Sequence, residues 1–373
     1  MWKKVSFVVM TLFLAVAGVV NCGNVSYAQK VRRGDIYTFP DKALRKIITA
    51  NFKESRIETD DVKEIVIGSY TDGCDEFDDE TVLNIESLKG LELFTNLEKL
   101  VILVPGTIDQ FSYTHTAENE QILNSLTHLK QIEFAGCTIK GSDIKLALPN
   151  LQTLMLGDED AGAQGMHSTY QSLDVSQCPN LKKLNCWGDR KLTKLVLPES
   201  GKLEYLACGK TGLSTITNLD KHTKLKVLGC SYTKISKLQL SKMTKLRELY
   251  CRNTKVKKLD VRKNKDLRML EVDASSTKKI LYPSLMPKWF GLQLFKMKKN
   301  RSMKNYLPKG YRYIKTEDAA IGTKLPDAYN PSTGKMKKVN GSLALTFKKK
   351  KRSMYVEFMG RYGAWWLDDY RKK

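Results

Sequence analysis

The chain has 373 residues, of which 42% are hydrophobic and 28% charged, and 63 basic against 40 acidic side chains give a formal net charge of +23. After Val20 no segment approaches the roughly 18 uninterrupted apolar residues that a transmembrane helix needs, which excludes such a helix there. A charge this positive would indicate nucleic-acid binding in a cytosolic protein. The compartment therefore decides how the charge is interpreted.

The first residues have the features of a secretory signal peptide. Two lysines precede an apolar run over residues 5–20, and small residues lead up to Ala28. We expect residues 1–28 to be removed, so that the mature chain begins at Gln29 and is secreted, with or without retention at the bacterial cell surface. Lipoprotein processing at Cys22 is the alternative, although the asparagine before it is unfavourable for that cleavage.

Export changes the partners that the positive charge indicates. Residues 29–90 carry 10 basic and 14 acidic side chains, residues 91–286 carry 29 and 20, and residues 287–373 carry 22 and 6. An exported basic region favours an anionic envelope polymer, an acidic glycan or a host surface over nucleic acid. A lysine-rich surface that keeps the protein soluble explains the charge equally well.

Residues 29–90 are predicted to form an N-terminal cap. Apolar residues recur at helical spacing within residues 37–53, after the N-cap candidate Asp41, and a helix there would cover the end of the core. A first short strand is expected over residues 62–67. The acidic loop 72–80 offers oxygen ligands for calcium but does not match a dedicated calcium loop, so we interpret it as solvated.

Residues 91–286 contain a repeat whose five most regular units read Leu-x-x-Leu-x-Cys, with valine in place of the last cysteine. Their first leucines are Leu181, Leu203, Leu225, Leu246 and Leu267, which are 22, 22, 21 and 21 residues apart. A period in the low twenties predicts an α/β solenoid, the leucine-rich-repeat horseshoe, in which each unit supplies one short strand. Wider spacings upstream imply two insertions, around residues 104–125 and 158–170, which we expect to be loops.

The cysteines of the repeat are predicted to be structural. Side chains alternate along a strand, so the second leucine and the cysteine of each unit should face the core. Cys186, Cys208, Cys230 and Cys251 then stack in parallel on successive strands, which cannot converge on a metal ion. We expect free thiols, with no metal and no cofactor. Thr211, Thr233 and Thr254 follow at the bend, where a hydroxyl can hydrogen-bond the backbone.

The repeats resemble those of exported leucine-rich-repeat proteins of Gram-positive gut and oral bacteria, the relatives of internalins. Residues 259–264 and 173–176 resemble the turn of that family, and the strand cysteines after Cys186 resemble its strand. Residues 39–43 and 87–97 resemble its N-terminal cap and the start of its first repeat. The resemblance covers residues 36–285 and implies an internalin-like adhesion or protein-binding function.

The residues between the inward positions are predicted to project from the concave face and to bind the ligand. The candidates for ligand binding are Lys183, Asn185, Trp187, Tyr205, Glu248, Tyr250, Arg252 and Glu271. Aromatic residues and arginine dominate interface hot spots, and the small Ala207, Gly209 and Gly229 are expected to leave a shallow hollow for a peptide segment or a sugar ring. The alternative is that these are incidental surface aromatics.

Residues 287–373 are predicted to form a small basic β-rich module, because the repeat spacing ends near Met286. Residues 342–347 and 354–359 alternate in polarity like two paired strands, joined by the cationic residues 348–353. Trp289 and Phe290 lie where a structure must cover the last repeat.

The sequence carries none of the usual local signatures of an enzyme. It has no Gly-x-Ser-x-Gly elbow, no His-Glu helix motif and no phosphate-binding glycine loop, and its four histidines are scattered. We therefore predict a non-enzymatic, exported binding or adhesion protein for a protein or glycan ligand, with a cationic C-terminal region for anionic polymers. The alternative is a secreted enzyme or enzyme inhibitor whose C-terminal module acts on targets held by the solenoid.

Overall fold

The computed structural model describes residues 30–32, 39–51, 56–67, 83–102, 111–134, 137–141, 143–157, 168–297, 301–318, 329–336 and 343–359. The expected signal peptide, the acidic loop 72–80 and most of the insertion at 158–170 lie outside the described residues. The chain divides into two compact units, Met1–Leu192 and Thr193–Lys373. Each unit has its own run of parallel strands, which we call its ladder.

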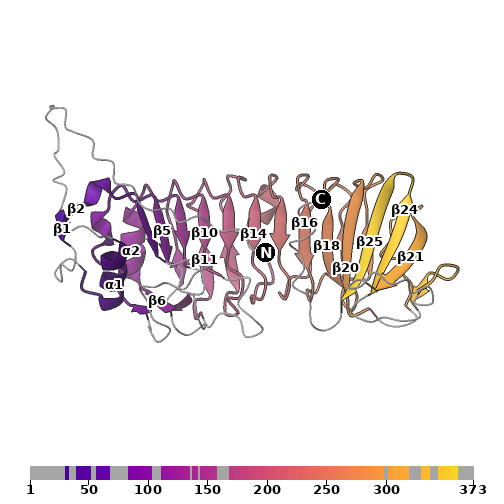
Figure 1. The fold of residues 1–373 in the computed structure, drawn as a ribbon, viewed down its shortest axis with the longest axis horizontal. Helices are drawn as coiled ribbons and strands as arrows, with labels where there is room; N and C mark the ends of the chain where they lie inside the picture. The colour runs from indigo at the N-terminus through magenta and orange to yellow at the C-terminus, as the bar shows by residue number, and fades with distance from the viewer. Residues whose placement is uncertain are drawn as a thin grey trace, which may run out of the picture. The chain divides into compact units, whose positions relative to one another are not determined.

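The ladder of the first unit consists of short parallel strands that lie side by side (Figure 1). In spatial order they are β3 (Glu64–Ile67), β5 (Lys99–Ile102), β7 (Gln131–Glu133), β10 (Thr153–Met155) and β12 (Lys183–Asn185). The register aligns one aliphatic side chain from each strand, namely Ile65, Leu100, Ile132, Leu154 and Leu184, and each is at most 1% exposed. The strand expected over residues 62–67 is confirmed by β3.

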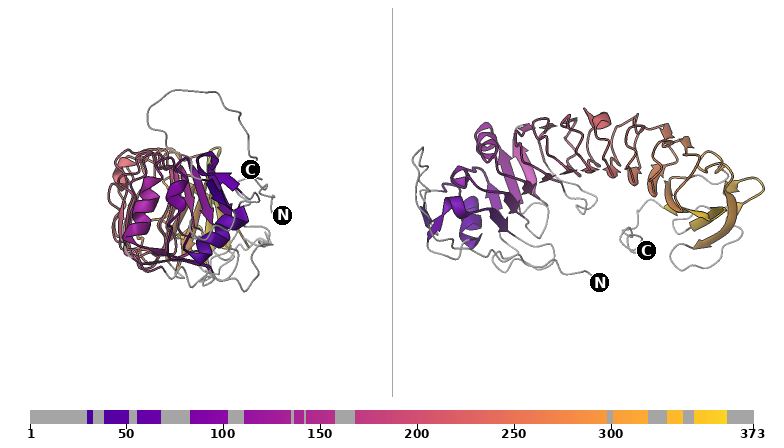
Figure 2. Two further views of the ribbon diagram at one scale, coloured as in Figure 1. Left: turned by 90° about the vertical axis from the view of Figure 1, so that its left-hand side faces the viewer. Right: turned by 90° about the horizontal axis from the view of Figure 1, so that it is seen from above.

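The remaining strands of the first unit lie outside its ladder. The parallel sheet β4 (Leu83–Ile85), β6 (Phe111–His115) and β8 (Thr138–Gly141) is one group, β9 (Ile144–Lys145) pairs with β11 (Ser172–Asp174), and β1 (Lys30–Arg32) pairs with β2 (Arg56–Glu58). Short 3-10 turns follow at η1 (Thr59–Asp61) and η2 (Leu91–Leu93). Figure 2 shows the helices and strands of the first unit, coloured from indigo to magenta, from two further sides.

The helix α1 (Lys42–Asn51) confirms the helix expected within residues 37–53. Asp41 starts it, because its Oδ1 accepts a hydrogen bond from the Leu44 N–H at 2.8 Å. The Oδ2 of Asp41 accepts from the N–H groups of Glu86 and Ser87, at 2.7 and 3.1 Å. One carboxylate therefore begins the helix and ties it to the segment after β4.

A second helix, α2 (Ala117–Ser125), lies at the end of the first insertion, where a loop was expected. The Thr116 hydroxyl caps it by accepting from the Asn119 N–H at 3.1 Å. Asn119 is buried and satisfies three backbone groups: its Oδ1 accepts from the Leu88 N–H at 2.8 Å, and its Nδ2 donates to the carbonyls of Glu86 and Thr114. The helix thus replaces part of a return segment and remains tied to its neighbours.

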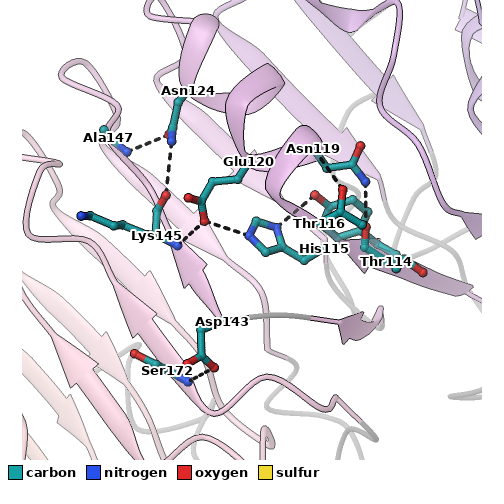
Figure 3. A network of polar contacts seen from close by, with 11 residues as sticks. Thr114, His115, Thr116, Asn119, Glu120, Asn124, Asp143, Lys145, Ala147 and Ser172 are labelled. Atoms are coloured by element: carbon teal, nitrogen blue, oxygen red, sulfur yellow. Dashed lines mark hydrogen bonds and ion pairs between the residues drawn. The ribbon is translucent and has the colours of Figure 1, made fainter.

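The outer side of α2 carries a polar network that joins it to the next repeat of the first unit (Figure 3). The Oε2 of Glu120 accepts from the Lys145 N–H at 2.7 Å and lies 3.1 Å from the Nε2 of His115. The Oδ1 of Asn124 accepts from the Ala147 N–H at 2.8 Å. Burial lowers the pKa of His115, so this histidine serves as a neutral hydrogen-bonding group within the fold.

The ladder of the second unit has eight strands in a single order (Figure 1). They are β14 (Tyr205–Ala207), β15 (Val227–Gly229), β16 (Glu248–Cys251), β18 (Met269–Asp273), β20 (Trp289–Phe295), β25 (Arg352–Met359), β24 (Leu343–Lys349) and β21 (Arg312–Asp318). The pairings from β14 to β25 are parallel, and the last two are antiparallel. The paired strands expected near residues 342–347 and 354–359 are confirmed by β24 and β25.

Short elements complete the second unit on the return side. They are β13 (Lys194–Val196), η3 (Leu219–Lys221), the parallel pair β17 (Lys258–Asp260) and β19 (Lys279–Leu281), and the hairpin of β22 (Tyr329–Asn330) and β23 (Lys335–Met336).

The repeat continues beyond Met286, where the sequence spacing was interpreted as ending. Strand β20 pairs in parallel with β18, which aligns Leu292 with Leu270 and Leu294 with Val272. Strand β25 then pairs in parallel with β20. The region after residue 286 therefore shares one sheet with the repeats before it. The leucine spacing does not reveal this unit, because Trp289 occupies the position of the first leucine.

Three ladder strands of the second unit, β14, β15 and β16, are each followed by a tight left-handed turn. Lys210, Tyr232 and Asn253 have φ of 50°, 60° and 52°. The threonine that follows each of them donates its hydroxyl proton to the carbonyl of the preceding strand cysteine, at 2.8 Å from Thr211 and Thr233 and 2.9 Å from Thr254. The expectation that a hydroxyl satisfies the bend is therefore confirmed.

The six cysteines within the described residues are free and buried. Burial raises the pKa of Cys178 to about 11 and that of Cys230 to about 12. Cys251 is the last residue of β16, and Cys208 and Cys230 directly follow β14 and β15. All three side chains are fully buried, as the alternation along the strands predicts.

We expect these thiols to be inert in the folded chain, because a pKa of about 12 at Cys230 leaves roughly one thiolate in ten thousand at pH 8. Ellman's reagent at pH 8 should label them only after unfolding in guanidinium. The Cys230→Ala variant should lower the unfolded count by one and leave the folded count unchanged. The buried ladder of thiols would be contradicted if the folded wild type were labelled rapidly and the Cys230→Ala variant were labelled at fewer sites.

Candidate functional site

The solvent side of the second ladder, which we call the outward face, is organised in two rows that cross the strands. The first row is Tyr205, Val227, Glu248, Met269, Gly291 and Tyr355, and the second is Ala207, Gly229, Tyr250, Glu271, Gln293 and Glu357. The row between them is Leu206, Leu228, Leu249, Leu270, Leu292 and Val356, and each of these is at most 1% exposed. Alternation along the strands therefore places the two rows on the opposite side from the core.

Five of the residues predicted to bind a ligand belong to this unit. Tyr205, Glu248, Tyr250 and Glu271 lie in the two rows and are half-buried. Arg252 directly follows β16 and is also half-buried. The structure thus brings five charged or aromatic side chains to one side of one sheet.

The other three predicted residues belong to the first unit, at and after β12. Lys183 is exposed and Trp187 is half-buried. Asn185 is only 4% exposed, and its Oδ1 accepts from the Trp187 N–H at 2.8 Å. The prediction that Asn185 offers its side chain to a ligand needs correction, because that side chain forms the turn that holds Trp187.

The small residues between the candidate side chains of the second unit are themselves buried. Ala207 is 3% exposed, and Gly209 and Gly229 are buried as well. A ligand would contact the charged and aromatic groups around them.

The tyrosine and glutamate of β16 form a fixed pair on the outward face. The hydroxyl of Tyr250 donates to the Oε2 of Glu248 at 2.7 Å. Because Glu248 and Tyr250 are two residues apart on one strand, their side chains lie on the same side of the sheet. The hydrogen bond between them restrains the tyrosine ring. A ring that is already ordered loses little conformational entropy when it is covered by a partner.

Arg252, which directly follows β16, and Glu271 of β18 both bond to the side chain of Ser231. The Cζ of Arg252 lies 3.8 Å from the ring centroid of Phe295 and 4.9 Å from that of Tyr232. The hydroxyl of Ser231 accepts from the Arg252 N–H at 3.0 Å and donates to the Oε1 of Glu271 at 3.2 Å. Burial raises the pKa of Glu271 to about 7, although the Arg252 charge and the Ser231 hydrogen bond lower it.

A second acidic group closes the edge of this cluster. Asp273 is 1% exposed, and its Oδ1 accepts from the N–H and the hydroxyl of Ser275 at 2.8 and 2.6 Å. Its Oδ2 lies 2.9 Å from the Nζ of Lys296, which also donates to the Oδ1 of Asn253 at 3.1 Å. Asp273 is therefore neutralised by a lysine, unlike Glu271.

The outward face extends over residues that sequence reasoning missed. The rings of Trp289 and Tyr355 lie 6.0 Å apart, and the Nε2 of Gln293 donates to the Oε2 of Glu357 at 3.1 Å. A Cβ at Gly291 would lie 3.1 Å from the Sδ of Met269, so this glycine admits the methionine between two strands. The spacing Trp-x-x-Leu-x-Leu at residues 289–294 is the signal that indicates this strand.

The outward face carries aromatic, charged and amide side chains. The described thiols are buried, and the described residues contain no group of three or more histidines, cysteines, aspartates and glutamates that could hold a metal ion. Among the helices that the structure describes, none is both long and apolar enough to cross a membrane. Ring contacts, hydrogen bonds and charge are what these side chains offer.

The repeats and the ladder of parallel strands define a leucine-rich-repeat fold. No family model matches the chain, and no curated protein matches it. Solved structures with a similar fold include the functional domain of InlJ from Listeria monocytogenes, which includes a cysteine ladder, at 14% identity and a TM-score of 0.27, over 90% of this chain and 99% of that one. Internalin C2 from the same species has 16% identity and a TM-score of 0.42, over 67% and 90%.

A further solved structure of this kind is the plant peptide hormone receptor RGFR1 in complex with RGF2. It has 15% identity and a TM-score of 0.36, over 57% of this chain and 39% of that one. At these identities the likeness concerns the fold alone.

The turn that holds Trp187 in the first unit also contains a buried acid. Asp189 is fully buried and accepts a hydrogen bond at Oδ2 from the hydroxyl of Tyr170. Burial raises the pKa of Asp189 to about 7, while the hydroxyls of Tyr170 and Ser168 lower it. The unfolded chain has the ordinary aspartate value, so the folded state binds the proton more tightly and loses stability as the pH rises from 4 to 7.

We expect Asp189→Asn to be more stable than the wild type at pH 8, by about 4 kcal/mol, and to be similar at pH 4. Guanidinium unfolding midpoints across this range measure the difference. Asp266→Asn, at an exposed position, is the matched control and should follow the wild type. Parallel pH profiles for the wild type and Asp189→Asn would contradict a buried, titrating Asp189.

Proposed function

We propose that the protein is an exported, non-enzymatic leucine-rich-repeat protein that binds a protein ligand through the outward face of its ladder. The observation that carries this proposal is the placement of Tyr205, Tyr250 and Arg252 on one side of one sheet, with two carboxylates beside them. Tyrosine and arginine supply a large share of binding free energy at protein interfaces.

The support for a protein ligand lies in how these groups are held. Tyr250 is bonded to Glu248, Arg252 lies against two aromatic rings, and the strands below them are fixed by buried leucines. A preorganised surface of this kind binds without the entropic cost of ordering loops. Lys183 and Trp187 are the corresponding candidates on the first unit.

We also propose that the turn between β24 and β25 binds an anionic envelope polymer. Lys350 and Lys351 in the turn and Lys348 near the end of β24 are exposed, whereas the Nζ of Lys349 donates to the Lys309 carbonyl at 3.1 Å. Several lysines on one exposed turn raise the local positive potential. Because β20 and β25 belong to the ladder, deleting residues 287–373 would expose a sheet edge, so substitutions in the turn are the better test.

We expect Tyr250→Ala and Tyr205→Ala each to weaken capture of the protein ligand by about tenfold or more, because each removes an aromatic ring from the interface. The ligand is first identified by cross-linking to the full chain, and its affinity is then measured by surface plasmon resonance. Leu285→Ala is the matched control, since Leu285 is 60% exposed and lies outside the ladder.

Two outcomes would overturn the proposed protein ligand. One is equal affinity of the tyrosine variants and Leu285→Ala. The other is a glycan array in which the same tyrosine variants lose binding to a sugar while cross-linking yields no protein partner.

For the cationic turn, we expect the triple variant Lys348→Gln, Lys350→Gln, Lys351→Gln to lose most of its retention on purified teichoic acid at about 0.15 M salt, where surface charge is only partly screened. The control removes the same charge elsewhere, through glutamine at the exposed Lys224, Lys245 and Lys265. Equal losses in both variants would show that the whole surface is responsible and not the turn.

A further inference from the structure

We propose that Arg252 anchors a subsite for a carboxylate, and that this subsite takes an acidic side chain of the protein ligand. The inference deepens the proposed function, on which it rests, by naming the chemistry of the ligand at one point of the outward face. It arises from the arrangement of Arg252, Tyr232, Phe295, Ser231 and Glu271.

The first step concerns how Arg252 is held. Its Cζ lies 3.8 Å from the centroid of the buried Phe295 ring and 4.9 Å from that of Tyr232. The Arg252 N–H donates to the Ser231 hydroxyl and the Arg252 carbonyl accepts from the Tyr232 N–H at 2.7 Å, so the backbone is fixed as well. Contacts with ring faces restrain a guanidinium without using its N–H groups.

The second step concerns the N–H groups that remain. In the described part of the chain the guanidinium of Arg252 forms no hydrogen bond and no ion pair, and the side chain is half-buried. The arginine at residue 262 differs, because its guanidinium donates to both carboxylate oxygens of Asp260. A restrained guanidinium with its donors unused matches the planar, two-oxygen geometry of a carboxylate.

The third step concerns the neighbouring acid. Glu271 feels the charge of Arg252 and bonds to Ser231 at 3.2 Å, and it does not form an ion pair with Arg252 in the described structure. Across the strands its neighbours in register are Tyr250 and Gln293, both of which carry no charge in this arrangement, and Asp273 on the same strand is paired with Lys296. Glu271 is therefore the acid that opposes a second carboxylate at Arg252.

The charge of the whole chain favours the same class of partner. A net charge of +23 attracts acidic segments and raises their association rate. The net charge cannot by itself determine where an acidic segment binds, because lysines are spread over the surface. The restrained guanidinium of Arg252 provides a defined position for one carboxylate.

The test uses two fluorescein-labelled peptides, one with three glutamates between glycine and serine residues and one with glutamines in their place. Binding to the full chain is followed by fluorescence anisotropy at about 0.15 M salt, at which distant surface charges are largely screened. We expect the glutamate peptide to bind more tightly. Arg252→Ala should weaken its binding by about tenfold, because charge-assisted hydrogen bonds are lost.

Two variants control for charge and shape. Arg252→Lys keeps the charge but not the planar group, so its affinity should lie between those of the wild type and Arg252→Ala. Arg268→Ala removes an exposed arginine near the start of β18 and should change the affinity by less than about twofold, the range of surface charge effects.

A pH series provides a second readout. The pKa of Glu271 is raised to about 7, so Glu271 is mainly neutral at pH 6 and mainly charged at pH 8. The wild type should therefore bind the glutamate peptide more tightly at pH 6. Glu271→Gln should bind at pH 8 as the wild type does at pH 6, which separates this effect from that of the histidines.

Equal weakening by Arg252→Ala and Arg268→Ala, or equal binding of the two peptides, would overturn the carboxylate subsite. Neither result bears on the tyrosine variants. If Tyr250→Ala abolishes capture of the protein ligand while Arg252→Ala does not, the proposed function stands and the subsite fails. If neither Tyr250→Ala nor Arg252→Ala weakens capture of the protein ligand, both the proposed function and the carboxylate subsite fail.

Discussion

The alternation of side chains along short parallel strands is the constraint on which the structure depends. In the second unit it places Leu228, Leu249 and Leu270 in one buried row, and each is fully buried. Because a strand has only two faces, the same register aligns the residues on either side of that row toward solvent. The same strand register therefore sets both the core and the outward face. A shift of one residue in any strand would turn its core side chains to solvent and its outward side chains to the core.

The turns that follow the ladder strands share one backbone form but present different side chains. Each turn is closed by the same threonine bond, yet the left-handed residue before that threonine differs from repeat to repeat. At Tyr232 it supplies a ring beneath Arg252, and at Asn253 it supplies a partner for Lys296. A non-glycine residue at positive φ costs roughly 1 kcal/mol, and the contacts of these side chains offset that strain.

Spacing in the sequence was sufficient to predict the ladder, the inward cysteines and the helix after Asp41, since each depends on residues close together in the chain. Trp289 concealed a further repeat, because an aromatic residue replaced the expected leucine. Asn185 was assigned to the ligand face because alternation predicts direction but not hydrogen bonding to the next turn. The contact of Arg252 with Phe295 joins different repeats, so no local pattern could indicate it.

The antiparallel end of the second ladder has a consequence for self-association. Strand β21 pairs with β24 on one side, and no strand follows it in the described sheet. An open strand edge can recruit a strand from another molecule and begin aggregation. Here the register shifts between Tyr313 and Lys315, and exposed basic side chains lie at Arg312 and Lys315. An irregular, charged edge of this kind is a poor template for the strand of another molecule.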